Sequence, residues 1–231
     1  MKVEKALVLA AGRSSRFGKH KMVHKIEGTS LLGRVLQSLK NSGIKSVYLV
    51  VGHEKENVIR EIGNDCAGLE VNYVIAKDWE KGNLHSFLSA KGTFKENFIL
   101  CMGDHIFDSR IVKKLIDANF DPNSENIVLY LAIDIKTYSD DDTRVLEENG
   151  KIIRIGKHLE TYNCTDTGFF LCSPKVFSYA ETCAKRGDSE LARCIQLVAE
   201  KGLARVIDVS GLHWVDVDTE KDLERAYHGE H

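Results

Sequence analysis

The chain has 231 residues, and its 32 lysines and arginines nearly balance its 34 aspartates and glutamates. This balance excludes a protein held to nucleic acid by bulk positive charge, so no nucleic-acid partner is expected. An apolar content of 43% and only two prolines indicate a packed globular protein. No apolar run approaches the ~20 residues of a membrane helix, and the first residues lack a signal-peptide cleavage site, so we expect a cytoplasmic chain that does not itself enter a membrane.

Strand-length apolar runs alternate with segments of helical periodicity, which is typical of βαβ units around a parallel sheet. Residues 6–9 are apolar at every position, as expected of a strand covered on both faces. Behind a Thr29-Ser30 cap, apolar residues at helical spacing predict a helix through residue 39. Further strands are predicted at 48–51, 71–75, 98–102 and 127–133, with helices at 58–62, 83–91 and 109–118.

Beyond about residue 140 the pattern changes. Asn149-Gly150 lies between the apolar stretches 144–146 and 152–155, which is a strong hairpin signal. Residues 168–172 predict another strand, 191–198 a helix, and 219–222 a capping box that opens a last helix. No linker or repeat interrupts the chain. We therefore predict one α/β domain, 1–231, in which a mixed, mostly parallel sheet lies between two helix layers.

The six cysteines and nine histidines are scattered along the chain. No two cysteines have the spacing of zinc ribbons, and no histidines pair on a helix face as in metalloproteases. We predict reduced, mostly buried thiols and no soft-metal site.

The segment after the first predicted strand is rich in small and basic residues. Five residues separate Gly12 from Gly18-Lys19, which excludes a Walker A loop, and Ser14 stands where a dinucleotide fingerprint requires glycine. What remains is a small-residue turn followed by Arg16 and Lys21, two cations that suit a triphosphate. The alternative is a polar loop whose basic residues are merely solvated.

Carboxylates occur at two places where a metal could bind. Asp104 follows the predicted strand 98–102, and Asp216 and Asp218 precede the last helix. If the fold joins them, their oxygens would hold Mg²⁺. The alternative is that Asp218-Thr219 only caps the helix.

Leu9 to Gly12, Arg16 and Lys21 resemble the signature loop of the nucleotidyltransferases that join a nucleoside triphosphate to a sugar or polyol phosphate. Here Gly18-Lys19-His20 replace the family's usual proline. The Gly-Asp pair at 103–104 and the Trp-x-Asp-x-Asp-Thr stretch at 214–219 are also typical. The resemblance implies Mg²⁺ on Asp104, Asp218 and Asp216, catalytic roles for Arg16 and Lys21, and a nucleotide site that includes Leu9, Ala10, Ala11, Gly12, Arg13 and Ser14.

Three middle segments extend the resemblance. Residues 81–86 resemble the family's base-recognising segment. The resemblance implies that Gly82, Asn83 and Ser86 bind the nucleotide; the alternative is that Asn83 is only a helix cap. Lys157 resembles the family's lysine that meets the acceptor's phosphate, which implies a catalytic and acceptor-binding role for it. The alternative is a solvated lysine. Short hydrogen-bonding side chains at 163–170 form either an ordinary turn or an acceptor site that includes Thr165, Asp166, Thr167 and Gly168.

Segments 156–157, 166–172 and 214–219 look most like CTP:inositol-1-phosphate cytidylyltransferases, and the resemblance covers 6–226. It implies a GT-A-like fold with a nucleotide-binding half, about 1–135, and an acceptor-binding half, about 136–231. The implied substrates are CTP and inositol-1-phosphate, and some members continue into a membrane-embedded transferase. The alternatives are another acceptor, of phosphocholine or hexose-1-phosphate type, and a non-catalytic nucleotide-binding regulator. No patch predicts an oligomer interface.

Overall fold

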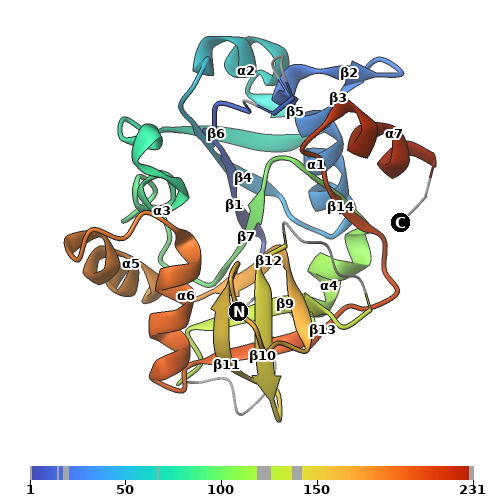
Figure 1. The fold of residues 1–231 in the computed structure, drawn as a ribbon. Coiled ribbons are helices and arrows are strands. Elements are labelled where there is room, and N and C mark those ends of the chain that lie inside the picture. The colour runs from blue at the N-terminus through green and yellow to red at the C-terminus, as the bar shows by residue number, and fades with distance from the viewer. Residues whose placement is uncertain are drawn as a thin grey trace.

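A ten-stranded sheet runs through the middle of the molecule (Figure 1). The computed structural model describes residues 2–14, 16–17, 21–66, 68–118, 126–136 and 142–228, so residues 18–20 of the basic loop lie outside it. Across the sheet, the strands follow the order β10 (Arg144–Glu148), β11 (Lys151–Gly156), β13 (Ala204–Asp208), β9 (Leu129–Asp134), β12 (Cys164–Cys172), β7 (Phe98–Met102), β1 (Lys5–Ala10), β4 (Ser46–Val51), β6 (Leu69–Ile75) and β5 (Asp65–Cys66).

Helices cover both faces of this sheet, because the central strands are apolar on both sides. In β1, Leu7 and Leu9 pack on one face, whereas Ala6 and Val8 pack on the other. One helix layer contains α3 (Asn83–Leu88), α5 (Val176–Lys185) and α6 (Leu191–Glu200). The opposite layer contains α1 (Leu31–Asn41), α2 (Lys55–Ile62) and α4 (Ser109–Ala118). The three-layer α/β fold predicted from the sequence is confirmed.

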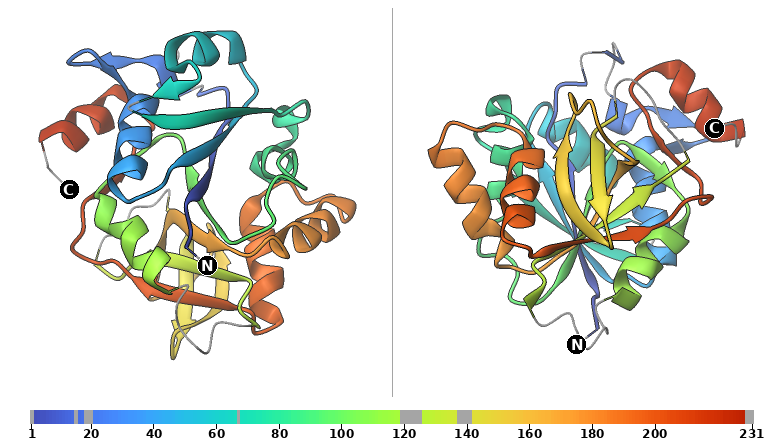
Figure 2. Two further views of the ribbon diagram at one scale, coloured as in Figure 1. Left: turned by 180° about the vertical axis from the view of Figure 1, so that it is seen from behind. Right: turned by 60° about the horizontal axis from the view of Figure 1, so that its bottom comes forward.

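The sheet becomes mixed in the second half, as expected. Strands β1, β4, β6 and β7 run parallel, whereas β12 pairs antiparallel with both β7 and β9. Asn149 and Gly150 have φ values of 51° and 76°, as a two-residue hairpin turn requires. The β10–β11 hairpin folds back so that β10 also pairs with β12 (Figure 2).

Three features of this half differ from the sequence prediction. Strand β12 starts at Cys164 and not at Gly168, because Thr165 already pairs with β9 and β10. Helix α5 and strand β13 were not predicted. Strand β13 contains only two consecutive apolar residues, Val206 and Ile207, and is defined by its parallel pairing with β9.

Two short strands outside the main sheet position the C-terminal segment. Strand β8 (His105–Phe107) pairs antiparallel with β14 (Trp214–Asp216). Helix α7 (Glu220–His228) follows, and the predicted capping box forms because the Thr219 hydroxyl accepts from the Asp222 N–H while the Asp222 carboxylate accepts from the Thr219 N–H. The remaining elements are η1 (Lys21–Val23), β2 (Lys25–Ile26), β3 (Thr29–Ser30) and η2 (Trp79–Lys81).

Two further sequence expectations concern the surface and the thiols. In the part of the chain that the structure describes, no helix combines the length and the apolar character needed to cross a bilayer. All six cysteines are free thiols, and five of them are buried.

Candidate active site

A cleft of about 920 Å³ opens beyond the carboxyl ends of β1 and β7. Most residues predicted for the site line it, from loops that are far apart in sequence. They are Leu9, Ala11, Gly12, Arg13, Ser14, Arg16, Lys21, Gly82, Asn83, Ser86, Asp104, Lys157, Asp166, Gly168, Asp216 and Asp218. Ala10 is 2% exposed and lies behind this wall, against a smaller pocket.

The turn after β7 is pressed against the loop after β1. The Gly103 N–H donates to the carbonyl of Leu9 over 2.9 Å, and a Cβ at position 103 would lie 2.9 Å from the Cβ of Ala10. Only glycine allows this approach. The contact places Asp104 at the base of the basic loop.

The β8–β14 pair brings the C-terminal carboxylates to the same point. His105 is in register with Asp216, and the Val217 N–H donates to the Asp104 carbonyl over 3.0 Å. The three aspartates predicted from separate segments, Asp104, Asp216 and Asp218, therefore form one acidic cluster.

Lys21 and Arg16 contact this cluster directly. The Lys21 Nζ lies 3.0 Å from Asp104 Oδ2 and 3.3 Å from Asp218 Oδ1, and the Lys21 side chain is only 3% exposed. Arg16 lies 2.9 Å from the other oxygen of Asp218. The alternative of a solvated Lys21 is excluded by its burial.

The charges of the cluster stabilise one another. Burial opposes the charged form of Lys21, but the negative charges of Asp104, Asp216 and Asp218 raise its pKa above the usual value. Burial likewise opposes ionisation of Asp104, yet His105 and Lys21 hold its pKa well below the usual range. Asp216 differs: burial and the neighbouring carboxylates raise its pKa.

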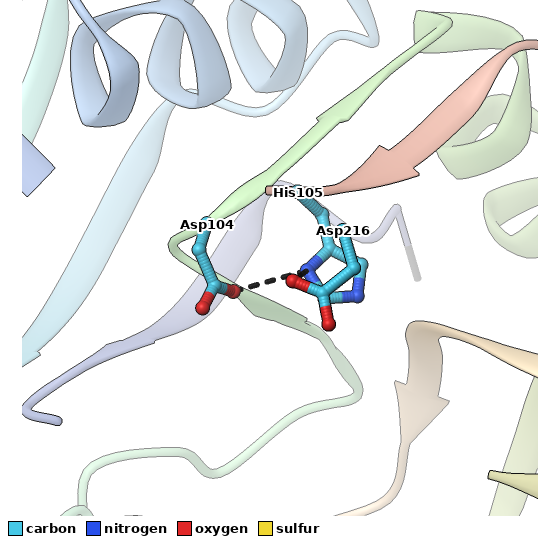
Figure 3. Close-up of side chains that lie close together, drawn as sticks. All are labelled: Asp104, His105 and Asp216. Carbon is cyan, nitrogen blue, oxygen red and sulfur yellow. Dashed lines mark hydrogen bonds and ion pairs between the residues drawn. The ribbon is translucent and has the colours of Figure 1, made fainter. Parts of the chain in front are cut away.

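His105 belongs to the site, although the sequence analysis did not single it out. Its Nδ1 lies 3.0 Å from Asp104 Oδ1 and 3.7 Å from Asp216 Oδ1 (Figure 3). Burial would lower its pKa, but Asp216 and Asp104 raise it to about 9. Its position directly after the Gly-Asp pair was the only available signal.

The acidic cluster has the donors that a hard divalent cation prefers. One ligand atom from each of Asp104, His105 and Asp216 lies within 4.8 Å of the others. Asp218 adds a further carboxylate to this group, because one of its oxygens and one of Asp104 both contact the Lys21 ammonium. Carboxylate oxygens beside a solvent-filled cleft fit Mg²⁺, which retains several water and phosphate ligands.

The segment predicted to recognise the base joins α3 to α6. Gly82 has a φ of 114°, and a Cβ there would lie 2.4 Å from the Ser189 carbonyl. The Asn83 side chain accepts from the Leu191 N–H over 2.8 Å, so Asn83 does not cap its own helix but anchors the start of α6. Ser86 is 5% exposed and lines the cleft.

Two residues of η2 complete this wall and were also missed from the sequence. The Arg13 guanidinium lies 5.7 Å from the Trp79 ring centroid and 3.6 Å from Glu80. A Cβ at Gly52 would collide with the Trp79 ring at 2.6 Å, so the ring is packed tightly against the end of β4.

The residues predicted to bind the acceptor divide into two groups. Lys157 is exposed at the cleft, and Asp166 lines it while accepting from the Gly168 N–H over 2.7 Å. Burial raises the pKa of Asp166 to about 6. Thr165 and Thr167 are fully buried, and their hydroxyls donate to the carbonyls of Asp134 and Ala132. These threonines support β12 and do not line the cleft, contrary to the expected direct contact with an acceptor.

A sequence profile of the MobA-like NTP transferase domain matches residues 6–134, more than half of the chain. The chain belongs to this family. The matched residues carry the loop after β1, the segment 81–86 and the Gly103-Asp104 turn. Nucleotidyltransferase chemistry is therefore the family's chemistry, and the residues predicted to bind the acceptor lie outside the matched region.

Several curated proteins are similar over nearly the whole chain. The "Bifunctional IPC transferase and DIPP synthase" of Aquifex aeolicus is 32% identical over 97% of this chain and 51% of that protein. The protein of the same name from Thermococcus kodakarensis is 30% identical over 96% of this chain and 50% of its own length. The chain thus spans about half the length of these relatives.

The chain is also similar to a uridylyltransferase and to a solved CTP transferase. "UTP--glucose-1-phosphate uridylyltransferase AglF" of Haloferax volcanii is 25% identical over 96% of this chain and 94% of that protein. Among solved structures, the inositol-1-phosphate CTP transferase from T. maritima superposes with a TM-score of 0.84 at 24% identity, covering 100% of this chain and 99% of the other. This structural similarity supports the GT-A-like fold.

Proposed function

We propose that this chain transfers CMP from CTP to inositol-1-phosphate, giving CDP-inositol and pyrophosphate. The proposal rests on the family, on relatives named IPC transferase, and above all on the cluster in which Lys21 is held between Asp104 and Asp218. This cluster joins a buried cation to carboxylates at the point where a triphosphate would enter.

The chemistry requires little from a general base. A phosphate monoester is largely dianionic at pH 7, since its second pKa is about 6. An oxygen of the acceptor phosphate forms a bond to the α-phosphorus of CTP, and the bond from that phosphorus to the bridging oxygen of the β-phosphate breaks. Pyrophosphate leaves with the electron pair. The main barrier is the repulsion between two anions.

The chain's own cations address this repulsion. Arg16 and Lys21 lie together at the acidic cluster, and they would bind the triphosphate and the charge that develops as pyrophosphate leaves. Lys157, which is exposed and lines the same cleft, would bind the acceptor phosphate. Removing one such preorganised cation typically costs about 3 kcal/mol, or roughly a hundredfold in rate.

Asp104, Asp216 and Asp218 are the residues that would hold Mg²⁺. When bound, Mg²⁺ supplies positive charge to the phosphate oxygens and lowers the electrostatic barrier to attack. Arg13, Gly12, Gly82 and Ser86 would contact the nucleotide, and the amide nitrogen of Asn83 would face the base while its oxygen anchors α6. The relatives are named for a second activity, DIPP synthase, and an activity of that kind would use the CDP-inositol product.

The test is pyrophosphate release with Mg²⁺ for CTP, UTP, ATP and GTP, each paired with inositol-1-phosphate, phosphocholine and glucose-1-phosphate. We expect the highest kcat/KM for CTP with inositol-1-phosphate. A preference for UTP and glucose-1-phosphate would instead assign the activity of the AglF relative. Binding of CTP without pyrophosphate release from any pair would favour a nucleotide-binding regulator.

A further inference from the structure

His105 occupies an unusual place between the nucleotide and acceptor sides of the cleft. Its side chain is only 9% exposed, and Nδ1 is directed to Asp104 at 3.0 Å and to Asp216 at 3.7 Å. The residue starts β8, while its ring also contacts Phe169 of the acceptor-side strand β12, with the ring centroids 5.9 Å apart. One imidazole therefore touches both halves of the site.

The orientation of this ring is fixed by its surroundings. The Trp214 ring stacks on it with an interplanar angle of 17° and a centroid separation of 6.4 Å. Trp214 is itself held by a 3.0 Å hydrogen bond from its Nε1 to the buried carboxylate of Asp134. Stacking on Trp214 fixes the plane of the ring. A half-turn within this plane would replace Nδ1 by a carbon and lose the contacts to Asp104 and Asp216, so these contacts fix which edge of the ring faces the carboxylates.

The second nitrogen, Nε2, has no hydrogen-bond or ion-pair partner among the residues that the structure describes. It is not sealed in the protein interior, as the Nε2 of His213 is, and His105 lines the cleft. A ring nitrogen that lacks a protein partner and belongs to a residue lining an open cleft is available to a ligand.

Gly168 leaves this nitrogen uncovered. A Cβ at position 168 would lie 2.7 Å from Nε2, and the residue has a φ of +80° that favours glycine. The Asp166 carboxylate, two residues earlier in β12, lines the cleft and is close enough for the charge of His105 to lower its pKa against the effect of burial. A carboxylate and an imidazole nitrogen thus face the acceptor side together.

We propose that His105 Nε2 binds a hydroxyl group of the acceptor, next to Asp166, and so makes the site selective for polyol phosphates. The inference rests on the proposed function. A hydroxyl group both donates and accepts hydrogen bonds, so it can pair with Nε2 whether or not that nitrogen carries a proton. The adjacent carboxylate accepts from a second hydroxyl, which suits the neighbouring hydroxyls of a cyclic polyol.

The test separates the two nitrogens of the ring. In His105→Asn, the amide nitrogen takes the place of Nδ1 beside Asp104, whereas nothing replaces Nε2. We expect the KM for inositol-1-phosphate to rise by about 10- to 100-fold, the range for one hydrogen bond involving a charged group. The KM for CTP should rise far less than the KM for inositol-1-phosphate. His85→Asn, in α3 and away from the cleft lining, is the matched control.

A second acceptor shows which group is recognised. Methyl phosphate carries the reacting phosphate but no hydroxyl. His105→Asn should therefore lower kcat/KM for methyl phosphate much less than for inositol-1-phosphate, and the preference for inositol-1-phosphate should collapse. An unchanged preference, or an equal loss for both acceptors, would overturn the inference. Pyrophosphate release by the wild-type chain tests the proposed function separately, because His105 is intact there.

Discussion

Lys21→Met should weaken catalysis and tighten metal binding at once. In the free protein, the Lys21 ammonium occupies the position where an oxygen of Asp104 and an oxygen of Asp218 converge, at 3.0 and 3.3 Å. A divalent cation that uses the same oxygens must compete with this ammonium, and like charges ~4 Å apart repel by about 4 kcal/mol at an effective dielectric constant of ~20. Removal of Lys21 should therefore raise the affinity for Mn²⁺ by tenfold or more in the absence of nucleotide.

Turnover should change in the opposite direction. Methionine retains the length and apolar stem of the side chain but cannot bind the triphosphate, so kcat should fall by roughly a hundredfold, or about 3 kcal/mol. The fold should also lose stability. Breaking a fully buried ion pair costs about 3–5 kcal/mol. Because the Asp104 and Asp218 side chains are 26% and 25% exposed, water relieves part of this cost. We expect a loss of about 2 kcal/mol, or a Tm lowered by ~4–8 °C in a chain of this size.

Three assays check this combination: pyrophosphate release, Mn²⁺ binding by electron paramagnetic resonance, and thermal unfolding. Lys45→Met is the control, since Lys45 pairs with Glu4 at 2.9 Å but its side chain is 68% exposed. Its effect on stability should stay below about 1 kcal/mol, with turnover and Mn²⁺ affinity unchanged. Near wild-type turnover in Lys21→Met, or an unchanged Mn²⁺ affinity, would refute the reasoning.

Three further predictions follow from the same contacts. Asp218→Asn should lower Mn²⁺ affinity at least tenfold, and more than Asp216→Asn does, because Asp218 shares the Lys21 position with Asp104; equal effects in binding assays would contradict this. Gly82→Ala should lower the Tm more than Gly92→Ala does. Both glycines have a positive φ, 114° and 86°, so alanine is strained at either position. Of these two positions, only at 82 would the added Cβ also lie 2.4 Å from a backbone carbonyl oxygen. The KM for the acceptor should fall as pH rises through about 6, because ionised Asp166 accepts hydroxyl hydrogen bonds and the protonated acid does so less well; a pH profile unaltered in Asp166→Asn would count against this role.

The sequence by itself determined the architecture. Residues 6–9 and 48–51 are apolar at every position, and such strands are stable only where helices cover both faces of a parallel sheet. Thr219 and Asp222 define the start of α7 through local hydrogen bonds. These features depend on neighbouring residues, so periodicity and capping were sufficient to predict them.

The arrangement of the acidic cluster was decided by tertiary structure. Asp104 and Asp218 are 114 positions apart, and they meet because β14 pairs with β8. Spacing alone gave no sign that Lys21 would be buried between them or that His105 would join the site, since both contacts depend on long-range register. Thr165 and Thr167 show the converse: their polar side chains suggested ligand contacts, but burial in β12 directs their hydroxyls to backbone carbonyls. Local sequence patterns specify the helices and strands, whereas the pairing of distant strands determines which charged side chains come into contact.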